Sequence, residues 1–221
     1  LATEEIAPAV AAFRDYLRDD YLPRARDDLS IKAVPNGEQC YEALLRAYHT
    51  AAIGGKATFE KGQAAVAANR SAVIARGDAM FGETDFAAIL VRTKSDPANR
   101  FRSEQELIDF TRALAPVARE KVAPFFSQLP EQALAVEPFP DFLKGTGQSS
   151  RYEPKPLAEG AAAYRINTDD WAEQTKGEAE IVLIHEGWPG HHLQIATSYA
   201  VDGLHPVMRL LGSTAYIEGW A

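Results

Sequence analysis

Apolar residues recur every three or four positions along the first part of the chain, which is the spacing of one helix face. The clearest case runs from Ile6 to Tyr21, where the apolar side chains are Ile6, Val10, Phe13, Leu17 and Tyr21. A similar pattern occupies residues 41–48, and the Ala-rich stretch 58–80 consists of good helix formers. The first eighty residues are therefore predicted to form amphipathic helices.

Residues that cap helix N-termini mark the next two elements. Thr84 is a candidate N-cap for a short helix through Val91. Ser103 and Glu106 match the S-x-x-E capping box, ahead of an apolar pattern that predicts a helix to about Phe126. Pro116 falls inside this segment and is expected to kink the helix.

The pattern changes after residue 128. Proline and glycine interrupt residues 129–160 repeatedly, so this segment is predicted to be a long irregular loop. Residues 161–168 then read as a short strand, with Tyr164 and Ile166 on one face and Arg165 and Asn167 on the other. The predicted fold is mainly α, with a small β element.

A second capping box, Thr175 and Glu178, begins a predicted helix that runs directly into the segment HEGWPGHHLQ at 185–194. Histidine is the commonest metal ligand in proteins. The familiar HExxH spacing is nevertheless absent, because Pro189 stands four residues after His185. The next histidine, His191, is six residues on, and a regular helix would not bring it to the face of His185.

Gly187, Pro189 and Gly190 suggest how the spacing is used. Proline breaks the helical hydrogen-bond ladder and glycine tolerates the resulting geometry, so a bulge within the helix is expected to absorb two residues. His191 would then take the place of the usual second histidine. Glu186 directly follows the first histidine, where HExxH enzymes carry the general base that acts on a metal-bound water.

A third ligand is expected from AYIEGWA, a predicted helix whose Glu218 lies 27 residues after His191. Two histidines and a later glutamate form the gluzincin arrangement, which suits one zinc ion with an open position. His192 is the less favoured ligand and is expected to bind substrate or donate a nearby hydrogen bond. Gln194 either orients a ligand or is a solvated helix residue.

Three further residues are candidate substrate contacts, each with a structural alternative. Tyr216 could donate to an oxyanion, although aromatic packing is the preferred interpretation. Tyr164 and Asn167 could hold an extended peptide by strand addition to the predicted strand 161–168. Trp188 and Trp220, one in each motif, are expected to pack the two metal-bearing helices together.

Composition narrows the class of protein. Among 221 residues, 23 Lys and Arg stand against 31 Asp and Glu, which gives a net charge of −8 and no basic run, so a nucleic-acid partner is not expected. The apolar runs are far shorter than the roughly 20 residues of a membrane span. Cys40 is the single cysteine and allows no intramolecular disulfide. The absence of a leader at Leu1 and the abrupt end at Ala221 suggest a fragment of a longer chain.

The two motifs HEGWPGHHLQ and AYIEGWA, with YLPRARDD and AYHT upstream, resemble the bacterial DUF885 family, which is related to zinc metallopeptidases. The family pattern is roughly HExxPGHxxQ followed by EGWALYxE, and this chain ends after the first four residues of the second motif. HEGWPGHHLQ is also similar to the HExGH core of certain oligopeptidases. The resemblance implies zinc at His185, His191 and Glu218, with Glu186 as base.

Family members are typically longer, mainly helical, and often exported or lipid-anchored. The expected fold is accordingly a helical, gluzincin-type metallopeptidase domain. Residues 1–128 would form one wall of the cleft, and 129–221 the loop, strand and metal-binding helices. The predicted function is zinc-dependent cleavage of a peptide substrate. A non-haem iron enzyme with a two-histidine, one-carboxylate site and an inactive helical binding module remain the alternatives.

Overall fold

The structure is a computed structural model that describes residues 2–205, 207, 208 and 212–221. The chain divides into two compact units, Leu1–Leu45 and Arg46–Ala221. The organisation expected from the sequence, in which regions 1–128 and 129–221 belong to one continuous domain, stays a prediction. The functional residues proposed from the sequence all belong to the second unit.

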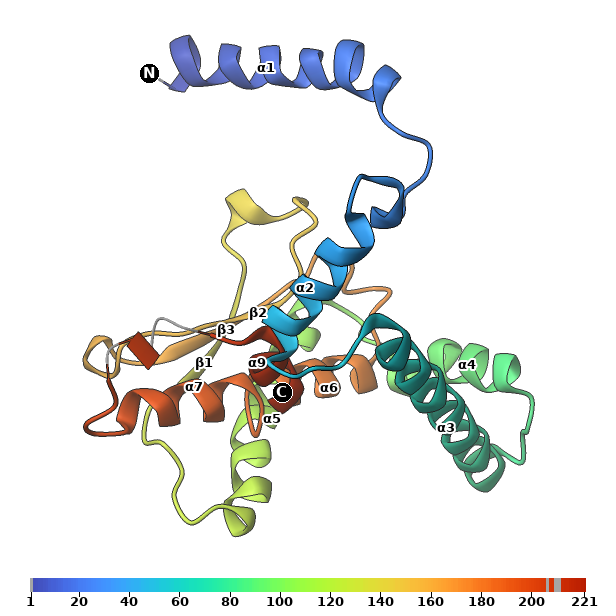
Figure 1. The fold of residues 1–221 in the computed structure, drawn as a ribbon. Coiled ribbons are helices and arrows are strands. Elements are labelled where there is room, and N and C mark those ends of the chain that lie inside the picture. The colour runs from blue at the N-terminus through green and yellow to red at the C-terminus, as the bar shows by residue number, and fades with distance from the viewer. Residues whose placement is uncertain (1, 206, 209–211) are drawn as a thin grey trace. The chain divides into compact units, whose positions relative to one another are not determined.

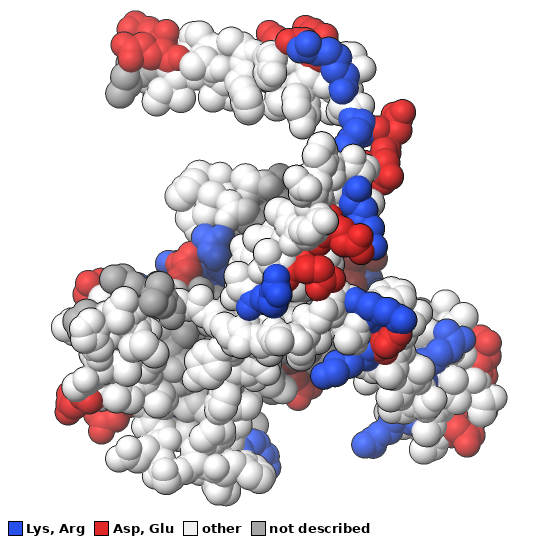
Figure 2. Space-filling view, in the orientation of Figure 1, with Lys and Arg blue, Asp and Glu red and all other residues white. Residues whose placement is uncertain are grey.

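The first unit contains helix α1 (Ala7–Tyr16), which single π-helical segments extend at both ends. This confirms the predicted N-terminal helix. Figure 2 shows an uncharged surface along α1 between charged groups at its two ends. Apolar side chains of α1 are exposed, and Phe13 retains 61% of its accessible area. Helix α2 (Gly37–His49) follows and crosses the boundary between the units.

Helices α3 (Gly55–Phe81) and α4 (Phe86–Ser95) are neighbours in Figure 1 and pack against each other. The Ile89 side chain of α4 packs against the α3 backbone at Gly77, where a Cβ atom would lie 2.2 Å from Cδ1 of Ile89. The predicted N-cap of α4 is off by one residue. Asp85, not Thr84, accepts a hydrogen bond from the Ala88 N–H at 2.8 Å, because its carboxylate suits the helix N-terminus better than a hydroxyl.

Helix α5 (Glu104–Val122) begins at the predicted N-cap Ser103, whose Oγ accepts from the Glu106 N–H at 3.0 Å. The reciprocal half of the capping box is shifted, since Glu106 accepts from the N–H of Arg102 at 2.7 Å. Pro116 lies inside the continuous helix, and a 3-10 turn, Ala123–Phe125, completes the predicted length.

Within residues 129–160, expected to be irregular, the structure contains two strands, β1 (Leu134–Pro138) and β2 (Arg151–Glu153). Both pair with β3 (Ala162–Ile166), and the sheet order is β1-β3-β2. The β1–β3 pair is parallel and the β2–β3 pair is antiparallel. The prediction missed β1 and β2 because each is short and bordered by prolines, which sheets tolerate at strand ends.

The alternation predicted for the strand 161–168 is confirmed in β3. Tyr164 and Ile166 are each 1% exposed, whereas Arg165 and Asn167 are half-buried. The buried face of β3 meets α5 and α6 in a single apolar core. Its central members are Leu107, Val136, Tyr164, Ile166 and Leu183.

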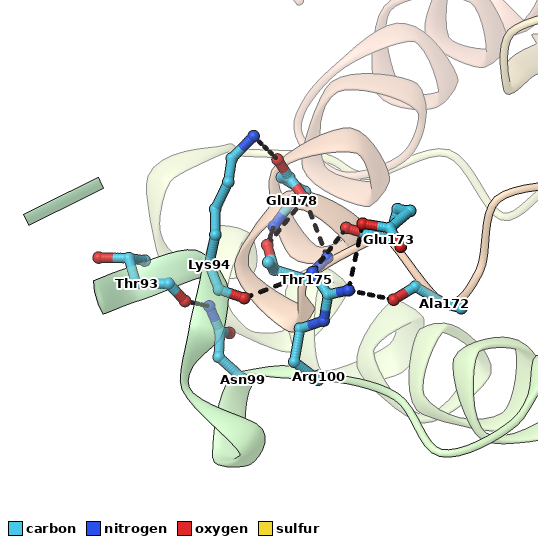
Figure 3. A network of polar contacts seen from close by, with 8 residues as sticks. All are labelled: Thr93, Lys94, Asn99, Arg100, Ala172, Glu173, Thr175 and Glu178. Atoms are coloured by element: carbon cyan, nitrogen blue, oxygen red, sulfur yellow. Dashed lines mark hydrogen bonds and ion pairs between the residues drawn. The ribbon is translucent and has the colours of Figure 1, made fainter. Parts of the chain in front are cut away.

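Helix α6 (Lys176–Glu186) begins with the predicted capping box. Thr175 Oγ1 accepts from the Glu178 N–H at 3.2 Å, and the Glu178 carboxylate accepts from the Thr175 N–H at 2.9 Å. Figure 3 shows how this end is attached to the end of α4 and the turn after it. The Arg100 guanidinium donates to the carbonyls of Ala172, Glu173 and Lys94, and Lys94 lies 3.9 Å from the Glu178 carboxylate.

The two remaining helices described are α7 (His191–Ala200) and α9 (Thr214–Trp220). Helix α7 follows α6 after a four-residue turn, and α9 packs against α7. The C-terminal end of α6, the N-terminal end of α7 and α9 are thereby brought to one place.

Candidate metal centre

The segment HEGWPGHHLQ forms two helices joined by a tight turn. Helix α6 ends at Glu186 and α7 begins at His191, so the expected bulge within one helix is wrong. The turn is closed by two hydrogen bonds, from the Gly190 N–H to the Ile184 carbonyl at 3.1 Å and from the Leu193 N–H to the Gly187 carbonyl at 3.3 Å. Pro189, with glycine at 187 and 190, ends the helix more completely than a bulge requires.

The glycines of this turn allow backbone contacts that a side chain would block. A Cβ atom on Gly190 would lie 1.8 Å from the carbonyl oxygen of His185. A Cβ atom on Gly187 would lie 2.7 Å from the carbonyl oxygen of Leu183. The sequence-based assignment of both glycines to the unusual histidine spacing therefore has a steric basis.

The turn brings His185 and His191 together with Glu218 of α9. The Nε2 atoms of His185 and His191 lie 3.5 Å and 3.6 Å from Oε2 of Glu218. One ligand atom from each of the three residues lies within 4.8 Å of the other two. Tetrahedral zinc, with ligand distances of about 2.0–2.1 Å, holds such atoms about 3.4 Å apart. Two imidazole nitrogens and one carboxylate oxygen are also donors that zinc accepts. The three residues form a group that can hold one metal ion.

Two hydrogen bonds attach α9 to the α6–α7 pair. The Trp220 indole N–H donates to the carbonyl of Pro189 at 2.7 Å. The Gln194 side-chain amide donates to the carbonyl of Tyr216 at 3.1 Å. Trp220 thus contacts the turn, as expected from the sequence, while Gln194 joins the two helices that carry His191 and Glu218.

Glu186 is buried beside this group, and its Oε2 accepts a hydrogen bond from the Tyr152 N–H at 2.7 Å. Burial raises the pKa of Glu186, while the Tyr152 hydrogen bond and His185 oppose the change. Burial lowers the pKa of His191, and the neighbouring His185 lowers it further. Both shifts favour neutral forms, and a neutral imidazole is the form that binds a metal.

A cavity of about 340 Å³ opens onto the group. His185, Glu186, His191 and Glu218 all line it, together with part of β2. A second cavity of about 590 Å³ shares His185 and Glu186 and includes both Tyr164 and Asn167. A further cavity, of about 870 Å³, contains none of the predicted metal ligands.

The other predicted site residues differ in their burial and in how well the structure fits the roles expected of them. His192 is fully buried, and its ring nitrogens lie 2.9 Å from the Gln132 carbonyl oxygen and 3.2 Å from the Tyr152 hydroxyl, which fits the hydrogen-bonding one of its two expected roles. Tyr216 is 64% exposed, which makes the preferred expectation of aromatic packing wrong; only its carbonyl is used near the site. The expected strand addition at Tyr164 is wrong, because β3 is the central strand and Tyr164 has strand partners on both sides. Asn167 lies after the end of β3.

Sequence reasoning missed Tyr152 and Gln132. Tyr152 donates to Glu186, and the carbonyl of Gln132 accepts from His192. Both lie in or beside the strands that were expected to be a loop, and both act partly through their backbone atoms. Backbone donors and acceptors have no residue signature, so a strand prediction was the one signal that could have found them.

Comparison with known proteins gives a fold and a family. The structure is similar to the crystal structure of the putative lipoprotein from Colwellia psychrerythraea, with a TM-score of 0.88 and 22% sequence identity. The match covers 99% of this chain and 38% of that chain, so this chain spans well under half of its relative. No curated protein matches the chain.

Among the described residues, no helix is both long and apolar enough to cross a membrane. A mainly helical architecture with a three-stranded sheet is shared with the solved structure. The model of the family described as "Bacterial protein of unknown function (DUF885)" matches residues 1–221. The chain therefore belongs to the DUF885 family.

Proposed function

We propose that this protein is a zinc-dependent hydrolase that cleaves peptide bonds. One observation carries the proposal: the ligand atoms of His185, His191 and Glu218 converge, and Glu186 lines the same cavity. A structural metal site has no need of a buried carboxylate beside it. A zinc ion held by these residues supplies Lewis acidity, which polarises a carbonyl and lowers the pKa of water.

Glu186 is the proposed general base. Its carboxylate accepts a proton from the attacking water and passes that proton to the leaving amine nitrogen. The Tyr152 N–H holds one carboxylate oxygen at 2.7 Å, which restricts the rotation of the side chain. The pocket keeps the carboxylate away from bulk solvent, because Glu186 is 7% exposed. This arrangement supports general base catalysis better than a purely structural role.

Gln194 is proposed to orient His191. Nδ1 of His191 and Oε1 of Gln194 are both buried, and neither has an assigned hydrogen-bond partner among the residues that the structure describes. The two residues lie three apart on α7, where side chains share a face. A bond from Nδ1–H to Oε1 would satisfy both atoms and leave Nε2 free for the metal. The contact of Gln194 with α9 supports the same role.

The substrate is proposed to lie across the two cavities that share His185 and Glu186. Tyr164 and Asn167 line the second cavity, so their assignment as substrate contacts stays a prediction, without strand addition. The three ligands come from helices, which departs from the strand-borne sites usual for two-histidine, one-carboxylate iron enzymes. Zinc is for this reason preferred to iron.

A pair of variants on α6 tests the proposal. In purified full-length protein, Glu186→Gln should retain about one zinc and lose peptide cleavage by roughly 10²–10⁴-fold, the size of a general base contribution. Glu180→Gln removes the same charge from an exposed position of the same helix and should change neither property. Normal cleavage by Glu186→Gln would refute the mechanism. Iron with oxygen consumption would favour the iron alternative, and zinc without any cleavage would favour the inactive binding module.

Location outside the cytoplasm is part of the proposal. The solved relative is described as a putative lipoprotein, and the family resemblance implied export or lipid anchoring. Cell fractionation of the native producer should place the full-length protein in the envelope. Recovery in the cytoplasmic fraction alone would contradict this location without bearing on the chemistry.

A further inference from the structure

The position of Glu186 depends on strand β2. Tyr152, whose N–H donates to the Glu186 carboxylate, is the middle residue of this three-residue strand. Strand β2 lies at the edge of the sheet, where β3 is its one strand neighbour within the described part of the chain. A short edge strand has few ladder hydrogen bonds, so other contacts are needed to hold it.

A buried imidazole supplies one of these contacts. Nε2 of His192 lies 2.9 Å from the carbonyl oxygen of Gln132, and its Nδ1 lies 3.2 Å from the hydroxyl of Tyr152. A carbonyl oxygen can only accept, so Nε2 carries the proton. Nδ1 of the neutral imidazole is then an acceptor, and the Tyr152 hydroxyl donates to it. The tautomer and the direction of both bonds follow from the geometry.

The surroundings of His192 fix the ring in place. Its exposure is 0%, and its ring packs edge-on against Trp188 at 4.6 Å and against Tyr152 at 5.6 Å between centroids. The Gln132 side chain donates to the carbonyls of Lys155 and Gly160, which lie between β2 and β3. His192 and Gln132 therefore hold β2 from two directions.

We propose that His192 is a positioning residue for Glu186. It holds the Tyr152 hydroxyl, which places β2 so that the Tyr152 N–H meets the Glu186 carboxylate. The consequence for activity rests on the proposed function, in which Glu186 is the base. His192 itself touches neither metal nor substrate. The two neighbouring histidines at the start of α7 thus have different proposed roles: His191 binds the metal, and His192 positions Tyr152.

Two substitutions separate this role from simple filling of the core. Asparagine at 192 places an acceptor near the position of Nδ1, whereas glutamine places a donor near the position of Nε2. His192→Asn should therefore keep kcat within about threefold, and His192→Gln should lower kcat about tenfold with KM and zinc content unchanged, as for other outer contacts of metal sites. Tyr152→Phe removes one oxygen and should match His192→Gln. Equal losses in both His192 variants would overturn the proposal.

Amide hydrogen exchange in the metal-free full-length protein tests the positioning without relying on activity. The backbone amide of residue 152 should exchange at least about tenfold faster in Tyr152→Phe and in His192→Gln than in the wild type. The amide of the core residue Leu183 should be unaffected. If Tyr152→Phe leaves the exchange at residue 152 unchanged, the positioning role is refuted. The expected exchange pattern together with a wild type that cleaves no peptide would instead refute the proposed function alone.

Discussion

Replacing Gly190 by alanine should disrupt the turn that brings His185 and His191 together. The added Cβ would lie 1.8 Å from the His185 carbonyl oxygen, and the next nearest atoms are also backbone. Ordinary contact begins near 3.4 Å, so one backbone segment has to move by about 1.6 Å. The close approach to the backbone of His185 and Ile184 is the obstacle to a side chain at Gly190.

We expect Gly190→Ala to cost about 3 kcal/mol of folding free energy, the upper part of the range for overpacking. For a chain of this size, that cost lowers the Tm by about 6–12 °C. Zinc affinity should also fall, because the carbonyl that has to move belongs to a ligand residue. Thermal unfolding of the metal-free protein and zinc competition titration measure the two effects.

Gly177→Ala is the matched control. Gly177 lies in the same helix as His185, and a Cβ atom there would meet nothing within 4 Å. Alanine should raise stability by up to about 1 kcal/mol through its helix propensity and leave zinc affinity unchanged. A Gly190→Ala protein as stable as the Gly177→Ala protein, with unaltered zinc affinity, would refute the steric argument.

The remaining predictions concern ligand orientation and acid stability. Gln194→Leu should weaken zinc binding by about 10–100-fold in a competition titration, because it removes the proposed partner of His191 and the bond to α9; unchanged affinity would show that Gln194 only fills space. The hydroxyl of Thr168 and then Lys144 lower the pKa of Glu104. Its carboxylate therefore contributes stability above about pH 4.3, its unfolded value, and this contribution is lost as pH falls through the lower folded pKa. Glu104→Gln should reduce the fall in the free energy of unfolding, measured in urea, as the pH is lowered below about 4.3. An unchanged dependence on pH would contradict the assignment.

Local signals in the sequence predicted the parts of the fold that local interactions determine. The Thr175 capping box and the alternation of Tyr164 and Ile166 are confirmed because they depend on neighbours a few residues away. The cap at Asp85 was missed by one position, since Thr84 and Asp85 are both good N-cap residues.

The pairing of segments that are distant in the sequence was harder to predict. Strands β1 and β2 are defined by their partner β3. Strand β2 has only three residues, too few to show a period of two, and β1 ends at Pro138 within a proline-rich segment. Tyr152 and His192 are 40 residues apart, and their contact follows only from that pairing. The sequence predicted an interruption of the helix at the correct residues, Gly187 to Gly190, but as a bulge and not as a turn between two helices. Glycine and proline show where a helix is interrupted, but not whether it continues beyond the interruption.

An anomalous diffraction map of the zinc-soaked full-length protein tests the metal site most directly. We predict one zinc peak within about 2.0–2.2 Å of the Nε2 atoms of His185 and His191 and a carboxylate oxygen of Glu218, the ordinary ligand distances of zinc. A protein that binds zinc through other residues, or leaves this group empty at saturating zinc, would contradict the account.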